Sequence, residues 1–154
     1  MVLMNASPAT TLNIRLATPP DLPVLKRLLK PLIAESLGSQ PDNLLDEVVT
    51  TNLKPFEQGQ SLTRFFLALK GKMPVGMVSV TPQPQRQAEI NSLVVDPAYR
   101  SQGVGSKLLL KAEAVARELG ARLVHLSAKI HRRSFYMQRG YKPVNAPQAL
   151  LRYG

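Results

Sequence analysis

The stretch that decides the fold is AEINSLVVDPAYRSQGVGSKLLL, residues 88–110. It predicts a strand over 88–95, a proline that ends it, and a helix that begins beside two glycines. Gly103 and Gly105 let the backbone approach a ligand, and the first amides of a helix favour negative charge. The loop therefore predicts a phosphate site, although a tight turn before a helix has the same pattern. It is neither a Walker loop nor a dinucleotide fingerprint, because no GKS or GKT follows and the third glycine is missing.

Downstream, apolar residues recur at helical spacing over 104–119, and Gly120 is expected to end that helix in a left-handed conformation. A strand over 122–128 follows. Because a long helix joins it to the strand at 88–95, the two strands should be parallel, with a right-handed crossover. Three short elements close the chain: a helix over 131–139 and a strand pair over 141–144 and 150–153.

Upstream, RFFLALK (64–70) and VGMVSVT (75–81) flank the connector GKMP, which predicts an antiparallel hairpin. The strand at 88–95 should extend this hairpin into a meander. Together these elements predict a mixed α/β (α+β) fold, with a mostly antiparallel central sheet flanked by helices.

The N-terminal part predicts a strand over 13–17 and two helices. Asp21 should cap the first helix, and Pro31 should kink or split it because proline has no amide hydrogen. The second helix should cover 41–53, with its first amides bonded by Ser39 or Asp42.

Composition bounds the class of protein. The chain has 154 residues, of which 44% are hydrophobic and 19% charged, as expected for one domain over 12–154 after a flexible tail at 1–11. The absence of cysteine excludes disulfides, thiolate zinc sites and cysteine nucleophiles. No apolar run reaches the ~20 residues that cross a bilayer, and the first residues do not resemble a signal peptide. We therefore expect a cytoplasmic protein with no membrane partner.

The net charge of +10 predicts an anionic partner, and the distribution of the charge predicts which half of the chain binds it. Residues 97–154 contain 11 basic and 2 acidic side chains, whereas residues 1–96 contain 9 and 8. We expect the anion to bind the C-terminal half, although basic side chains also serve solubility alone.

With its context, the loop resembles the acetyl-coenzyme A signature of the GNAT N-acetyltransferase superfamily, Arg/Gln-x-x-Gly-x-Gly/Ala, matched at Arg100, Gly103 and Gly105. A second segment, SFYMQRGY at 134–141, is similar to the family's Phe-Tyr-x-x-x-Gly-Phe/Tyr. The resemblance covers nearly the whole chain in element order. It implies a soluble acetyltransferase with acetyl-CoA as cosubstrate and a splayed parallel strand pair that holds it.

The resemblance also implies which residues bind the cosubstrate. The pantetheine arm would pair with the strand backbone, and the pyrophosphate would lie on the loop amides. The implied residues are Leu93, Val94, Val95, Arg100, Ser101, Gln102, Gly103, Val104, Gly105 and Ser106.

Two residues are implied as catalytic. Tyr136 stands where the family has the tyrosine that protonates the departing thiolate; a phenol pKa of ~10 suits that task, but a core aromatic fits the residue too. Glu89 matches a position where some members have a general base, and a solvent-exposed strand glutamate fits it equally well. The amine would attack directly, with no acyl-enzyme, and a backbone amide near Val95 would stabilise the oxyanion.

Other polar residues carry weaker expectations. His125 and His131 have no further zinc-ligating residues at a suitable spacing, so we expect structural roles for them and no metal. The family often has asparagine and alanine at the positions of Lys129 and Arg132, which leaves the cofactor contacts of that helix open. Ser101 replaces the usual glycine of the loop.

The acceptor is predicted from residues 31–60, which cover the acceptor side in this family. Five carboxylates oppose Lys54 there and predict a cationic amine acceptor, either a small molecule or a protein lysine or N-terminus: Glu35, Asp42, Asp46, Glu47 and Glu57. Two alternatives stay open: a coenzyme A-binding sensor without turnover, and a basic nucleic-acid-binding module. With 5% aromatic residues, a base-stacking platform is poorly supplied. The resemblance also makes a homodimer an option.

Overall fold

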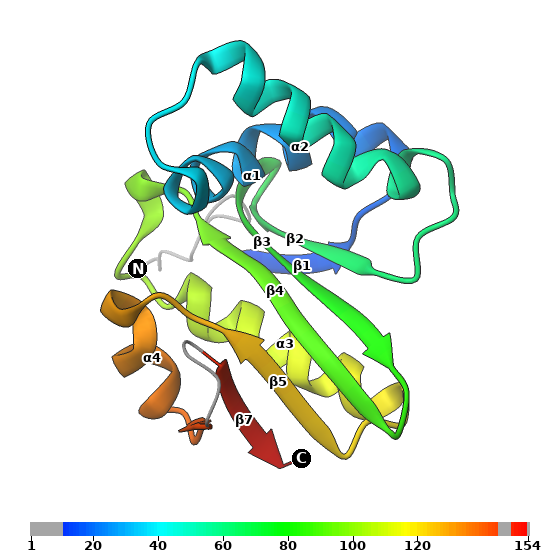
Figure 1. Ribbon diagram of the computed structural model, residues 1–154, viewed down its shortest axis with the longest axis vertical. Helices are drawn as coiled ribbons and strands as arrows, with labels where there is room; N and C mark the ends of the chain where they lie inside the picture. The colour runs from blue at the N-terminus through cyan, green and yellow to red at the C-terminus, as the bar shows by residue number, and fades with distance from the viewer. Residues whose placement is uncertain (1–10, 145–148, 154) are drawn as a thin grey trace, which may run out of the picture.

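The computed structural model describes residues 11–144 and 149–153 (Figure 1). It has a seven-stranded sheet in the order β1-β2-β3-β4-β5-β7-β6, in which β4 and β5 are the parallel pair and the other neighbours are antiparallel. The strands are β1 (Leu12–Leu16), β2 (Arg64–Lys70), β3 (Met73–Gln83), β4 (Gln87–Val95), β5 (Leu123–Ser127), β6 (Lys142–Pro143) and β7 (Ala149–Tyr153). The predicted mixed, mostly antiparallel sheet, its meander and its parallel crossover are confirmed.

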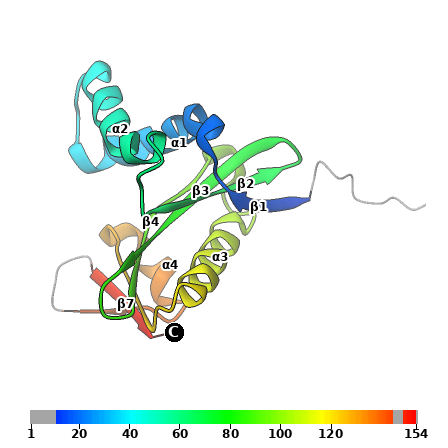
Figure 2. The same cartoon turned by 90° about the vertical axis from the view of Figure 1, so that its right-hand side faces the viewer.

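Helices cover both faces of the sheet (Figure 2). The helices α1 and α2 lie on one face, and α3 lies on the other. A short 3-10 turn at Ile130–Arg132 leads into α4. The helices are α1 (Leu22–Leu37), α2 (Asp42–Glu57), α3 (Val104–Glu118) and α4 (Arg133–Met137).

The strand β2 shows why the sheet carries helices on both sides. Its side chains alternate between two cores: Phe66 and Ala68 pack with α3, whereas Phe65, Leu67 and Leu69 pack with α1 and α2. An apolar run without alternation is the expected pattern for a strand buried on both faces. The central strands therefore hold both helix layers in place.

Local expectations at the N-terminal helices are partly wrong. Pro31 lies inside α1 and does not split it. Asp21 is the N-cap residue of α1, as expected, but its side chain makes no capping hydrogen bond; its carboxylate accepts from the Thr18 amide at 2.8 Å and pairs with Arg15 at 2.7 Å. The guanidinium of Arg15 and the amide of Thr18 hold this carboxylate, so it does not accept from the first amides of α1. No side chain caps α2 either, so the expectation for Ser39 or Asp42 is wrong; Pro41 is its N-cap residue.

The feature that positions the site is the separation of the parallel pair. The strands β4 and β5 pair only at Gln87–Glu89 against Leu123–His125. Beyond this point β4 contains a bulge opposite Met77–Ser79, with Ser92 at φ 54°. A bulge bends its strand and disrupts the ladder, and the two strands diverge as expected. Their separated ends leave room between the helix layers.

The predicted tail at 1–11 lies outside the described residues except for Thr11, whose carbonyl accepts from the Gly71 amide at 3.4 Å. Within the part of the chain that the structure describes, none of the helices combines the length and the apolar character needed to cross a bilayer.

Candidate functional site

A cavity of about 760 Å³ opens at the diverging end of β4. Its walls come from α1, the end of β4, the loop that leads into α3, and α4. Nine of the ten residues implied for the cosubstrate line it together with Tyr136: Leu93, Val94, Val95, Arg100, Ser101, Gly103, Val104, Gly105 and Ser106. We call it the larger cavity.

The glycine loop has the conformation that its sequence suggests. Gly103 is the N-cap of α3 at φ 82°, and among the described residues no side chain caps the first amides of this helix. The first turn of α3 therefore presents backbone donors and the positive end of the helix dipole to the cavity. A Cβ on Gly105 would meet Phe135 and Val95 at ordinary contact distances of 3.5 and 3.6 Å.

Ser101 occupies the left-handed region, at φ 63°. This conformation is rare for a residue with a Cβ and costs roughly 1–2 kcal/mol. The glycine that the family has at this position would adopt it freely. The substitution in this chain therefore puts local strain into the loop.

Two implied residues do not line the larger cavity. The side chain of Gln102 accepts instead from the ammonium of Lys70 at 2.5 Å. Glu89 lies in β4 beside His125 of β5, on the sheet face opposite the buried Ala88 and Ile90. No described cation lies within ion-pair distance of Glu89, and its role as a base stays a prediction.

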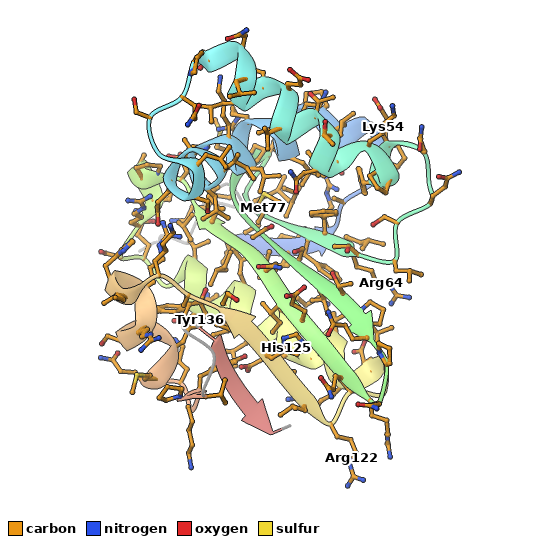
Figure 3. All side chains as sticks on the ribbon, in the orientation of Figure 1. Lys54, Arg64, Met77, Arg122, His125 and Tyr136 are labelled. Carbon is orange, nitrogen blue, oxygen red and sulfur yellow. The ribbon has the colours of Figure 1, made fainter. Side chains whose placement is uncertain are left out.

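Tyr136 lies at the junction of two cavities. It is buried, with its ring edge-on to Phe135 and Tyr141 at centroid distances of 5.1 and 5.8 Å. Burial raises the pKa of Tyr136 to about 12, while the charge of Arg132 acts in the opposite direction. Its hydroxyl is protonated at neutral pH, as at the ordinary tyrosine pKa of ~10, and the raised pKa makes it a weaker acid than a free phenol. Figure 3 shows Tyr136 where α4 faces β5, away from His125.

A second cavity of about 180 Å³, the smaller cavity, shares Leu32, Glu35, Leu93, Arg132 and Tyr136 with the larger one. It lies between α1, the diverging ends of β4 and β5, and the start of α4. Its further lining residues are Ser36, Ile90, Asn91, Ser92, Ser127, Ala128 and Lys129. The two cavities meet where the parallel strands separate.

Sequence reasoning missed Arg139. Its guanidinium stacks over Phe135, with 3.8 Å to the ring centroid, and donates to Ser106 Oγ at 3.1 and 2.5 Å. It thus joins α4 to the first turn of α3. The contact spans 33 residues, and no local pattern signals it.

A second contact that the sequence did not indicate joins two residues that line both cavities. Glu35 of α1 pairs with Arg132 at 2.7 Å and lies 3.4 Å from His131 Nε2. The five carboxylates of residues 31–60 do not all lie at the cavities. Glu35 lines both cavities, whereas Asp42 and Asp46 pair with Lys30. Glu35 is itself paired with Arg132, so the carboxylates of this segment do not argue for a cationic acceptor.

The histidines have protein partners. His125 Nε2 lies 2.7 Å from Gln83 Oε1 and does not line either cavity, whereas His131 lines the larger one. Among the residues described by the structure, no three His, Asp or Glu side chains gather in a group that could hold a metal ion.

Comparisons with known proteins agree with this architecture. The family model described as acetyltransferase (GNAT) family matches residues 30–141. An aminoalkylphosphonate N-acetyltransferase of Salmonella typhimurium is 44% identical over 84 residues, which is 49% of this chain and 54% of that protein. An uncharacterized N-acetyltransferase of Methanocaldococcus jannaschii is 29% identical over 97 residues, 57% of this chain and 43% of that protein. The chain thus spans about half the length of the curated relatives it matches.

Solved structures share the fold. The PaiA N-acetyltransferase from Thermoplasma acidophilum, crystallised with coenzyme A, superposes with a TM-score of 0.75 at 17% identity, covering 94% of this chain and 99% of that one. An acetyltransferase from Thermus thermophilus has a TM-score of 0.73 at 22% identity, covering 96% of this chain and 100% of that one. At these identities the likeness shows the fold alone.

Proposed function

Because the chain belongs to the acetyltransferase (GNAT) family, we propose that it moves the acetyl group of acetyl-CoA directly to a primary amine. The observation that carries this proposal is the position of Tyr136. This buried, protonated phenol lines both the larger and the smaller cavity, at the point where β4 and β5 separate. A phenol at such a junction can donate its proton to a leaving group that departs from one cavity while a nucleophile enters from the other.

The larger cavity fits coenzyme A. Its backbone amides at the first turn of α3 suit a pyrophosphate, and two of its arginines, Arg100 and Arg139, suit further anionic oxygens. The end of β4 has lost its parallel neighbour, so the backbone of Leu93–Val95 can bond an amide-bearing arm. When bound, acetyl-CoA supplies an activated thioester carbonyl.

The residues of this chain would divide the reaction. Tyr136 Oη donates a proton to the departing sulfur, and the Val95 amide stabilises the negative charge that develops on the carbonyl oxygen. The nitrogen loses two protons on becoming an amide: the second restores the Tyr136 hydroxyl, and the first, that of the acceptor ammonium, goes to Glu89. Glu89 lies two residues from Asn91 of the smaller cavity on the same strand. Cysteine has no part in this route, in keeping with a chain that has none.

We further propose a small-molecule acceptor. The relative from Salmonella typhimurium is named for aminoalkylphosphonates, and the smaller cavity has the size for such a molecule. The cytoplasmic location and the homodimer stay predictions, the second of which light scattering after size-exclusion chromatography measures directly.

A thermal melt tests the proposal. Acetyl-CoA at ~100 times its dissociation constant should add ~2.7 kcal/mol, a shift of roughly 5–10 °C, that persists in high salt. ATP and a polyanion serve as controls. Equal shifts with all three that disappear in salt would instead indicate a nucleic-acid-binding surface. Release of free CoA thiol with an amine then separates an enzyme from a sensor.

A further inference from the structure

The smaller cavity has a charge composition that the general acetyl-transfer reaction does not require. Three of its lining residues are charged: Glu35, Lys129 and Arg132. Two cations against one carboxylate leave a net positive charge of one unit facing the cavity. An acceptor amine attacks in its neutral form, so the amine itself leaves this charge unbalanced.

The three charges are not equally engaged. Arg132 Nη2 binds Glu35 Oε2 at 2.7 Å, so this guanidinium already has a carboxylate partner beside the cavity. Lys129 Nζ has no carboxylate partner among the described residues, and it reaches the Glu35 backbone carbonyl only at 3.5 Å. Lys129 is half-buried, so its charge is not fully hydrated either. Its ammonium is therefore the cation best able to bind an anionic group of a ligand.

Lys129 also belongs to one cavity only. It lines the smaller cavity and not the larger one, whereas Arg132 lines both. The larger cavity has its own cations in Arg100 and Arg139. The charge of Lys129 therefore belongs to the smaller cavity and not to the larger one.

The rest of the lining suits a small polar ligand. Asn91 and Ser127 contribute an amide and a hydroxyl from the separated ends of β4 and β5. The volume of about 180 Å³ is many times the ~10–15 Å³ that a cavity needs to hold one water molecule. A short amine with one further polar group matches this space.

We propose that the smaller cavity is the acceptor pocket and that it selects short primary amines carrying an anionic group, a carboxylate or a phosphonate. Lys129 binds the anion together with the donors of Arg132 that Glu35 leaves open. Glu35 is a positioning residue that orients Arg132. This inference rests on the proposed acetyl transfer and names the class of its acceptor.

The test compares acceptors of equal chain length: 2-aminoethylphosphonate, β-alanine, ethanolamine and ethylenediamine. The readout is kcat/KM from CoA thiol release. A hydrogen bond to a charged group contributes about 1.5–3 kcal/mol, so at least one anionic amine should exceed ethanolamine by roughly 10-fold to 100-fold. The better of the two anions identifies the group as carboxylate or phosphonate.

A charge reversal locates the effect. Lys129→Glu should cut kcat/KM for the preferred anionic amine by ~10-fold or more and improve ethylenediamine relative to it, while the KM of acetyl-CoA stays the same. Lys129→Gln should lie between the two. The matched control is Lys72→Glu, at an exposed lysine in the β2–β3 turn, which should leave the ranking of acceptors unchanged.

The outcomes separate the two proposals. If acetyl-CoA neither raises the melting temperature nor supports any acceptor, the acetyltransferase function and this inference both fail. If acetyl-CoA binds but ethanolamine or ethylenediamine is preferred, the function stands and the anion pocket is refuted. A Lys129→Glu enzyme that melts normally and loses affinity for acetyl-CoA instead of the acceptor would also refute it.

Discussion

Two walls meet at Tyr136, and they are built in different ways. The cofactor wall, Leu93–Val95 and Gly103–Ser106, is the part that we propose binds acetyl-CoA through its backbone, and it comes from within 14 consecutive positions of the chain. The acceptor wall is the set of charged side chains that we propose binds the acceptor: Glu35, Lys129 and Arg132, of which Glu35 and Arg132 meet across 97 residues. A backbone wall is set by local sequence and tolerates few changes, whereas a side-chain wall can be altered one residue at a time. We expect the cofactor wall to determine the acetyl transfer itself and the acceptor wall to determine which amine is accepted.

Tyr136 serves both walls, so its loss should have the largest effect. Tyr136→Phe removes one hydroxyl and keeps the ring contacts with Phe135 and Tyr141. Loss of a general acid typically costs 10²–10⁴-fold, and we expect kcat to fall by ~10²-fold with unchanged acetyl-CoA affinity. Steady-state kinetics and calorimetry measure the two quantities. A loss of less than ~3-fold would show that Tyr136 is a packing residue.

The pH dependence of stability follows from the same residue. Burial raises the pKa of Tyr136 to about 12, above its unfolded value of ~10. The folded state therefore holds this proton more tightly, and the resulting stability is complete below pH ~10 and lost as the pH rises toward 12. Two pKa units correspond to about 2.7 kcal/mol. The free energy of unfolding of wild type should fall more steeply over this range than that of Tyr136→Phe; parallel curves would contradict the buried phenol.

The cofactor wall should be sensitive to added side-chain atoms in β3, the strand that packs beside it. A Cβ on Gly76 of β3 would lie 2.8 Å from the Val94 carbonyl oxygen and 2.9 Å from Leu108 Cδ1. Gly76→Ala should therefore push β4 away from β3 or α3 and cost about 1–3 kcal/mol, measured by urea unfolding. Gly105→Ala is the matched control, because its Cβ meets only ordinary contacts; it should change stability by less than ~1 kcal/mol. If the two variants change the free energy of unfolding equally, β4 and α3 accommodate the added Cβ at Gly76 by small shifts.

The same contrast explains what the sequence could predict. The strand, loop and helix of 88–119 follow from periodicity and glycine placement, and the resemblance indicated the splay. Arg139 on Ser106 and Glu35 on Arg132 were not foreseen, because tertiary packing alone brings those pairs together. The expected capping hydrogen bonds of Asp21 and Asp42 were wrong for a related reason. The Asp21 carboxylate is bound by Arg15, and that of Asp42 by Lys30.

The acceptor wall should be held weakly. Glu35 and Arg132 keep 31% and 33% of their side chains exposed, and ion pairs at such positions contribute about 0–1 kcal/mol. A double-mutant cycle with Glu35→Gln and Arg132→Gln should give a coupling below ~1 kcal/mol in urea unfolding. At the same time Glu35→Gln should raise the KM of the acceptor, not that of acetyl-CoA. A coupling above ~2 kcal/mol would make this pair a structural element and weaken the contrast between the walls.

The smallest effect is expected in the loop itself. Ser101→Gly should relieve the left-handed strain at φ 63°, worth roughly 1–2 kcal/mol, but it also frees the unfolded chain by ~0.4–1 kcal/mol. The net gain in the free energy of unfolding should be about 0.5 kcal/mol. Ser101→Ala separates backbone from hydroxyl, because alanine keeps the Cβ and should not stabilise the protein. If alanine stabilises as much as glycine, the strain is not in the backbone. If Ser101→Gly also changes the ranking of acceptors, the two walls are coupled through the loop, and the acceptor wall does not determine this ranking alone.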